Sequence, residues 1–331
     1  MKVLLTGATG FLGSRLLETL SRHPGICKLI ASGRTIRPTH HVNHPTVSYQ
    51  LGDLTDPGVA EGLAMQADCI IHAAALSSPW GKHQDFFLAN ILATRYLVQA
   101  AARQGTGRFV FVSSSSVYVD KRDRFNIKES DPLPTRFINS YAATKREAEL
   151  EVIRSGLPYI ILRPRGLIGR GDTVIMPRLI HAFGKGKLRR IGKGDNLVDL
   201  TPVENMVSAV EASLFAGSRA LNQIYNISNG SPVFLWEAIG QILKLLGHDF
   251  DTGKRVPFWV ASALARILEL KSVVRGGAEP PLTVYSVVTL ARSFTMDISR
   301  ARENLAYEPR VSTAEAMAEF VDWYREHPWK Q

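Results

Sequence analysis

A tyrosine and a lysine stand four positions apart in the segment NSYAATKREAEL, residues 139–150. In a helix, residues four apart project from one face, so Tyr141 and Lys145 are expected to lie one turn apart. A free phenol has a pKa near 10, and lowering it by about three units requires about 4 kcal/mol. A neighbouring ammonium group can supply part of this free energy. The pair therefore predicts proton exchange by Tyr141, with Lys145 lowering the pKa of its hydroxyl.

Three glycines interrupt the segment VLLTGATGFLGSRLLETL, residues 3–20, where a predicted strand gives way to a predicted helix. In a dinucleotide-binding turn, Gly7 permits backbone angles that a Cβ forbids, Gly10 lets the main chain approach a pyrophosphate, and Gly13 lets the helix pack on the sheet. The phosphates would meet the free N–H groups of the helix N-terminus. A tight structural turn without a ligand is the alternative interpretation.

The end of the second predicted strand, in LIASGRTIRP, residues 29–38, carries no acidic residue. An acid there accepts hydrogen bonds from the adenosine ribose of NAD and repels a 2′-phosphate. With Ser32 and Gly33 in its place and Arg34 next, the sequence favours NADP(H) over NAD(H), unless Arg34 is an ordinary surface residue. Asp53 and Leu54 after the third strand are expected near the adenine ring, although Asp53 can also cap a helix.

Short apolar runs alternate with helical patterns over the first half of the chain, as a doubly wound parallel sheet requires. We expect an α/β Rossmann-type fold with a smaller, interleaved C-terminal substrate lobe. The nucleotide-binding domain would span 1–164 with 203–228 returning to it, and the lobe would comprise 165–202 and 229–331. Strands are expected at 2–7, 28–33, 46–52, 68–75, 108–114 and 158–164, and helices at 11–22, 57–66, 84–104 and 140–155.

The composition restricts the partners of this 331-residue chain. Forty Lys and Arg against thirty Asp and Glu give a net charge of +10, but the basic residues are scattered, so we expect no nucleic-acid site. Cys27 and Cys69 predict a reducing, cytoplasmic compartment, since Cys69 lies in a buried run and a strand from Lys2 leaves no room for a signal peptide. His40, His41 and His44 occupy a polar loop, where we expect no metal.

Taken in order, these motifs resemble the extended short-chain dehydrogenase/reductases. The resemblance rests on the glycine loop, Asp53-Leu54, the HAAA of 72–75, the serines and the Tyr141/Lys145 pair. The segments YNISNG, EPPLT and DISRARENLAYEPRVSTAEAM are similar to the 3β-hydroxysteroid dehydrogenase-like branch, especially bacterial 2-alkyl-3-oxoalkanoate reductases. Pro202 and Asn205 depart from that branch, where Tyr and Asp are frequent.

The resemblance implies a catalytic Ser114, with Ser115 as a rival, beside Tyr141 and Lys145. Ser114 would bond the substrate oxygen, and Lys145 would hold the nicotinamide ribose. It also implies a homodimer through the helices at 84–104 and 140–155. The residues expected to bind the cofactor are Thr6, Gly7, Thr9, Gly10, Phe11, Leu12, Gly13, Arg34, Asp53, Leu54, Ala73, Ala74, Ala75, Asn90, Tyr141, Lys145, Pro164 and Arg165.

Three functions remain open from the sequence. The first is an NADP(H)-dependent oxidoreductase that interconverts a ketone and a secondary alcohol on a bulky hydrophobic molecule, either a 2-alkyl-3-oxo acid or a sterol. The second is an NAD-dependent nucleotide-sugar epimerase or dehydratase, in which KGKLRRIGKG, residues 185–194, would cradle a diphosphate. The third is a dinucleotide-sensing protein without turnover.

The segment PFWVASALARILELKSVVR, residues 257–275, predicts a helix whose face carries Phe258, Ala261, Ala265 and Leu268, followed by Lys271 and Arg275. It could pack against the second lobe, cover an apolar substrate, or lie on a membrane surface. The stretch is too short to cross a bilayer.

Overall fold

A seven-stranded parallel sheet forms the centre of the protein in a computed structural model that describes residues 1–250 and 255–328. Its order, β12-β7-β5-β4-β1-β2-β3, reverses direction at β1, so the loops after β1 and β4 diverge and leave a crevice between them. The strands are β1 (Lys2–Thr6), β2 (Lys28–Ser32), β3 (Val47–Tyr49), β4 (Cys69–His72), β5 (Arg108–Val112), β7 (Tyr159–Pro164) and β12 (Gln223–Ile227).

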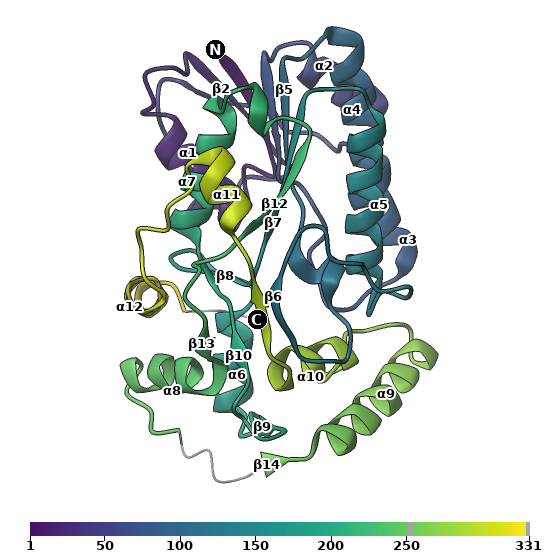
Figure 1. Cartoon of the computed structure of the whole chain (residues 1–331), viewed down its shortest axis with the longest axis vertical. Coiled ribbons are helices and arrows are strands. Elements are labelled where there is room, and N and C mark those ends of the chain that lie inside the picture. Colours follow the sequence, from purple (N-terminus) through teal and green to yellow (C-terminus); the bar gives the residue numbers. More distant parts are fainter. Residues whose placement is uncertain (251–254, 329–331) are drawn as a thin grey trace.

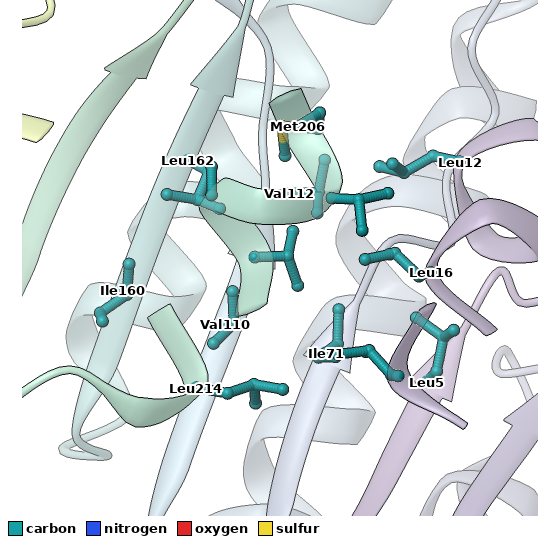
Figure 2. Packing of buried hydrophobic residues seen from close by; sticks show 14 of the residues in the cluster. Leu5, Leu12, Leu16, Ile71, Val110, Val112, Ile160, Leu162, Met206 and Leu214 are labelled. Atoms are coloured by element: carbon teal, nitrogen blue, oxygen red, sulfur yellow. The ribbon is translucent and has the colours of Figure 1, made fainter. Parts of the chain in front are cut away.

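Helices cover both faces of this sheet (Figure 1). One layer contains α1 (Phe11–Leu20), α7 (Val203–Phe215) and α11 (Ser299–Leu305), and the other contains α2 (Pro57–Ala64), α4 (Ala93–Gln104) and α5 (Ser140–Arg154). Figure 2 shows the first layer from inside: Leu12 and Leu16 of α1 and Met206 of α7 pack over Ile71 and Val110 of the sheet. These apolar contacts fix the glycine loop and the strand ends relative to one another.

A second lobe lies beyond the carboxyl ends of the central strands (Figure 1). Its largest sheet has the order β13-β10-β15-β6, and two further pairs, β8–β11 and β9–β14, are parallel. The strands are β6 (Arg124–Ile127), β8 (Leu167–Ile168), β9 (Arg190–Ile191), β10 (Leu197–Val198), β11 (Thr201–Pro202), β13 (Val233–Phe234), β14 (Arg255–Val256) and β15 (Phe294–Met296). The helices are α6 (Met176–Gly184), α8 (Leu235–Leu245), α9 (Phe258–Val274), α10 (Val284–Ala291) and α12 (Thr313–Glu326).

The α/β architecture predicted from the sequence is confirmed, with one local difference. The helix expected at 84–104 has three parts: α3 (His83–Phe86), a π-helical segment (Phe87–Leu92) and α4. Asn90, in the π-helical segment, bonds the main chain of Leu76 through its side-chain amide, which a wider turn accommodates. Short 3₁₀ segments occur at Pro38–His40, Ser115–Tyr118 and Ser218–Ala220.

Two late segments of the chain join the nucleotide-binding layer. Strand β12 pairs with β7 in parallel, and α7 packs beside α1 on the same face of the sheet. The domain boundaries given above stay a prediction. This pairing places residues near 203–228 in the same sheet and helix layer as residues 1–164. Between 1 and 250 and between 255 and 328, no helix combines the length and the apolar composition that a membrane crossing requires.

Candidate active site

A cleft of about 1050 Å³ lies between the sheet and the second lobe, at the carboxyl ends of the strands. The glycine loop, the loops after β2 and β4 and the end of β5 form one wall, and α6 and α10 contribute to the other. Of the expected site residues, the cleft is lined by Gly7, Thr9, Gly10, Phe11, Leu12, Gly13, Arg34, Asp53, Leu54, Ala73, Ala74, Ala75, Ser114, Tyr141, Lys145, Pro164 and Arg165.

The glycine loop has the form that a pyrophosphate requires. Gly7 has a φ of +70°, and a Cβ there would come 2.7 Å from the amide nitrogen of Ala74. A Cβ on Gly13 would overlap the carbonyl oxygen of Gly7. Gly10 caps α1 without any side-chain hydrogen bond, which leaves the first N–H groups of the helix directed at the cleft. The loop therefore fits the phosphates of a dinucleotide.

The adenosine end of the cleft is basic. Arg34 and Arg37 both line it, and Arg37 was not among the residues expected from the sequence. A Cβ on Gly33 would overlap the Thr9 hydroxyl, so this position has no room for the acid that NAD-specific sites place there. Asp53 accepts hydrogen bonds from the amide and the hydroxyl of Thr55, which hold the pKa of its carboxyl below the ordinary value.

Tyr141 lines the cleft from the first turn of α5. Asn139 caps this helix by accepting a hydrogen bond from the Ala142 amide. The side chains of Ser114 and Ser77 lie beside the Tyr141 hydroxyl and favour its ionised form, which lowers its pKa. Ser114, rather than its neighbour Ser115, therefore acts on the tyrosine. Ser77, in the loop after β4, was missed because a single serine in a loop has no sequence pattern.

Lys145 lies one turn further along α5 and is buried. Its Nζ donates a hydrogen bond to the Val112 carbonyl at 2.7 Å and lies 4.1 Å from the centre of the Phe111 ring. Burial lowers the pKa of this ammonium to about 7. Burial also raises the pKa of the Tyr141 hydroxyl. In the protein alone, the desolvation of the phenolate outweighs the neighbouring groups that lower this pKa, and the lowering expected from Lys145 together with a cationic nicotinamide stays a prediction.

A network of buried charges lies beside Lys145 and includes a residue of the same helix. Glu149, one turn after Lys145, accepts two hydrogen bonds from Arg163 at 2.8 and 2.6 Å and one from the Ser113 hydroxyl at 2.6 Å. Arg163 also donates to the Tyr118 hydroxyl. The sequence did not reveal this network, although the spacing of Tyr141, Lys145 and Glu149 puts all three on one helix face.

Thr6 and Asn90 do not line the cleft, contrary to expectation. Thr6 is buried and bonds His72 at 2.6 Å. The other nitrogen of His72 lies 2.9 Å from the Thr94 hydroxyl, and burial lowers the pKa of this imidazole to about 3. Asn90 joins Leu76 to α5 by donating to the Thr144 hydroxyl. Their polar side chains instead hold the cleft-lining loop after β4, which explains why both residues are polar yet buried.

Arg165 is a buried cation in the wall of the cleft. Its guanidinium lies 4.1 Å from the centre of the Phe294 ring. Burial lowers the pKa of this group by more than the nearby Tyr285 and Asp199 raise it. Among the described residues, no carboxylate lies within 4.0 Å of its nitrogens. Such a cation offers its charge to an anion bound in the cleft.

Other residues that the sequence singled out have structural contacts. Asn205 bonds Asn229 and the main chain of Val311, which ties α7 to the loop before α12. His40 lies 3.3 Å from the Thr9 carbonyl oxygen, His41 stacks on Tyr49, and His44 bonds Thr46. The basic segment 185–194 contributes no residue to the lining of the cleft.

Residues 3–228 match the model of the NAD dependent epimerase/dehydratase family. The chain belongs to this family. It is 31% identical to the 2-alkyl-3-oxoalkanoate reductase of Stenotrophomonas maltophilia, covering 96% of this chain and 97% of the relative. It is also 31% identical to 3beta-hydroxysteroid-dehydrogenase/decarboxylase isoform 1 of Arabidopsis thaliana, in an alignment that covers 96% of this chain and 78% of that protein. UDP-glucuronic acid 4-epimerase from Bacillus cereus, solved with NAD, shares the fold with a TM-score of 0.75 and 23% identity over 99% of both chains.

Geometry and family agree on the class of protein. The chain is an enzyme of the short-chain dehydrogenase/reductase type, and its cofactor is a nicotinamide dinucleotide. The roles given to its glycine loop, Tyr141 and Lys145 stay a prediction of the family resemblance.

Proposed function

We propose that this enzyme uses NADP(H) to interconvert a ketone and a secondary alcohol on a bulky hydrophobic 3-oxo acid. The observation that carries the proposal is that Tyr141 lies beside Ser114 and one turn from Lys145, in the same cleft as the buried Arg165. The names of the two curated relatives support it, since one is a 3-oxoalkanoate reductase and the other a hydroxysteroid dehydrogenase/decarboxylase.

The residues of this chain divide the work of such a reduction. When bound, the cofactor supplies the hydride. Ser114 donates a hydrogen bond to the carbonyl oxygen, and Tyr141 gives that oxygen its proton. Lys145 holds a positive charge beside the tyrosine and offsets the cost of the buried phenolate that remains. In the oxidative direction, Tyr141 takes the proton back.

The cleft suits a substrate that is apolar at one end and anionic near the reacting carbon. Arg165 would hold the carboxylate of a 3-oxo acid, and in that role it differs from the cofactor contact expected from the sequence. Burial makes such a charge-assisted pair strong and selective. The apolar part would meet the aliphatic side chains that line the cleft, which come from the loop after β4, from the π-helical segment and from the second lobe: Leu76, Leu88, Val174, Ile175, Leu179, Val198, Leu200, Leu235 and Leu290.

The preference for NADP(H) rests on Arg34, Arg37 and the absence of space at Gly33. Arg34→Gln would remove a positive charge that a 2′-phosphate needs and that the ribose of NAD does not. We expect KM for NADPH to rise about tenfold and KM for NADH to change less than twofold. Equal changes for both cofactors would contradict the preference.

The first test follows NADPH oxidation with long-chain 2-alkyl-3-oxo acids, 3-ketosteroids and UDP-sugars. Turnover with the oxo acids should fall at least 100-fold in Tyr141→Phe, which keeps the ring and removes the proton donor. Tyr285→Phe is the matched control, because Tyr285 lines the same cleft without a bond to Ser114. Full turnover by Tyr141→Phe would overturn the proposal.

A second test concerns the substrate carboxylate. Arg165→Met should raise KM for a 3-oxo acid at least tenfold and leave KM for its methyl ester unchanged, while Arg165→Lys should restore part of the affinity. A neutral 3-ketosteroid that outperforms every oxo acid, with no effect of Arg165→Met, would redirect the proposal to sterols.

The nucleotide-sugar epimerase is the second candidate, because the solved structures that share this fold include enzymes bound to NAD and UDP-glucuronic acid. Segment 185–194, the diphosphate cradle expected for such an enzyme, lies outside the cleft lining, which favours the reductase. Stoichiometric NAD released on denaturation would favour the epimerase.

A dinucleotide sensor would show no turnover with any substrate in the assays above. A homodimer through α4 and α5 stays a prediction of the family resemblance, for light scattering to test.

A further inference from the structure

Helix α9 turns apolar side chains toward solvent. Trp259, Leu270 and Val274 are 73%, 68% and 86% exposed, whereas the exposed face of a surface helix usually carries polar residues. With Ala263 and Ile267 they recur at spacings of four, four, three and four, so they form one stripe along the helix. Leu264 and Val273, also exposed, widen it.

The opposite face of α9 accounts for the packing of the helix. Ala261 and Ala265, from the face that the sequence singled out, are buried in a cluster with Val287 of α10. That face therefore does what the ordinary packing interpretation expected. The exposed stripe is additional, and within the described chain nothing covers it. Contiguous apolar surface of this kind marks an interaction site.

The charges beside the stripe are positive. Lys271 and Arg275 are exposed beside it, and Arg266, four residues before Leu270, is exposed on the same face. The one acidic residue in the sequence of α9, Glu269, accepts a hydrogen bond from the Val284 amide and so is held against α10. The whole chain adds a net charge of +10. An apolar stripe with basic rims and a tryptophan is the arrangement of helices that lie in a membrane interface.

The position of α9 connects this stripe with the cleft. Figure 1 shows α9 at the outer edge of the second lobe, with α10 between it and the sheet. Tyr285 and Leu290 of α10 line the cleft. The Gly277 carbonyl, just after α9, accepts a hydrogen bond from Trp80 Nε1 at 3.1 Å. Trp80 follows the cleft-lining residues Ser77, Ser78 and Pro79.

We propose that α9 docks on an anionic membrane surface, with its axis in the plane of the bilayer and the Trp259–Val274 stripe in the interfacial layer. A second copy of this chain fits the stripe less well, because pairing the two stripes would bring the basic rims of both copies together. Anionic headgroups instead neutralise Arg266, Lys271 and Arg275. A water-insoluble substrate would then enter the cleft beside the bilayer, but the docking does not depend on the proposed reaction.

The test is sedimentation of the full chain with vesicles of phosphatidylcholine containing 30% phosphatidylglycerol, compared with pure phosphatidylcholine. We expect binding to the anionic vesicles and at least tenfold weaker binding to the neutral ones. Leu270→Ser/Val274→Ser should lose at least tenfold in the partition coefficient, since both side chains are exposed and their loss opens no cavity. Met65→Ser is the matched control, because Met65 is 61% exposed at the end of α2.

The charge and the stripe can be separated in the same assay. Arg266→Gln/Lys271→Gln should lower binding to anionic vesicles toward the neutral level and leave the Trp259 stripe intact. Circular dichroism melting of each variant verifies the fold. Wild-type protein that stays in the supernatant with both vesicles would overturn the proposal. A second outcome would also overturn it: no binding to vesicles, together with a dimer that Leu270→Ser/Val274→Ser abolishes. That result would assign the stripe to contact with a second copy of the chain.

Discussion

Two successive turns of α5 hold buried charges in opposite ways. Glu149 is surrounded by donors: Arg163 at 2.8 and 2.6 Å, Arg146 at 2.9 Å and Ser113 at 2.6 Å. Lys145, four residues earlier, has a carbonyl and a ring beside it, and its ammonium has no carboxylate within 4.0 Å among the described residues. Accordingly the pKa of Glu149 is held low and that of Lys145 is lowered to about 7.

The difference separates charges that serve the fold from charges that serve a ligand. A fully paired buried charge stabilises the fold as long as its partners are present. A buried cation without a countercharge costs stability, and proteins retain such groups where chemistry uses them. Arg165 belongs with Lys145 by this criterion, and Arg163, two positions earlier, belongs with Glu149.

Removing the charge of Lys145 should affect turnover more than anything else on this helix. Lys145→Met keeps the length of the side chain and removes the cation, so kcat should fall by about 10²–10⁴-fold. The free energy of unfolding should stay the same or rise, because an uncompensated buried charge is lost. Steady-state kinetics and urea unfolding of the same preparation measure both. A marked loss of stability would place Lys145 with the paired charges instead.

Removing the charge of Glu149 should do the reverse. Glu149→Ala leaves Arg163 buried without its partner and should lower the free energy of unfolding by about 3–5 kcal/mol. Glu149→Gln, which keeps one acceptor oxygen, should lose less. Urea unfolding measures both variants, and Glu151→Ala, which removes a partly exposed partner of Arg95 on the same helix, is the control. A Glu149→Ala protein as stable as the Glu151→Ala protein would contradict the comparison.

His72 represents a third case, a buried group kept neutral. Burial and, to a smaller degree, the charge of Lys145 lower the pKa of its imidazole from 6.5 to about 3. Between these values the unfolded chain binds one more proton than the folded chain. Stability therefore falls as the pH falls from 6.5 toward 3, by about 1.4 kcal/mol per pH unit from this group. His72→Gln should lose that part of the slope in urea unfolding at pH 6.5, 5.5 and 4.5, and parallel slopes in both proteins would refute it.

The sequence predicted the parts of the molecule whose signal is local. The strands β1, β2, β4, β5 and β7 appear as unbroken apolar runs because both faces of the sheet are covered. The glycine loop and the Tyr141/Lys145 pair are equally local, since steric demand and helix periodicity fix their spacing. The strands of the second lobe were not predicted from the sequence, because at two to four residues they are too short to show a periodicity.

The contacts that were missed join distant parts of the chain. Glu149 meets Arg163 across two elements, and the Tyr141 hydroxyl meets Ser77 from a loop 64 positions earlier, which no spacing rule predicts. Asn90 was expected in the cleft because of its place in the family pattern, and its amide instead holds Leu76. The raised pKa of Tyr141 depends on burial, a property of the folded protein alone.

The hydrogen bond between Trp80 and Gly277 offers a physical connection between the cleft and α9. It links the loop after β4, which lines the cleft, to the turn that follows α9. If substrate in the cleft changes the affinity of α9 for a bilayer by some factor through this bond, the bilayer changes the affinity of the cleft for that substrate by the same factor. Docking of α9 as proposed would thus tune the enzyme to the surface beside which it works.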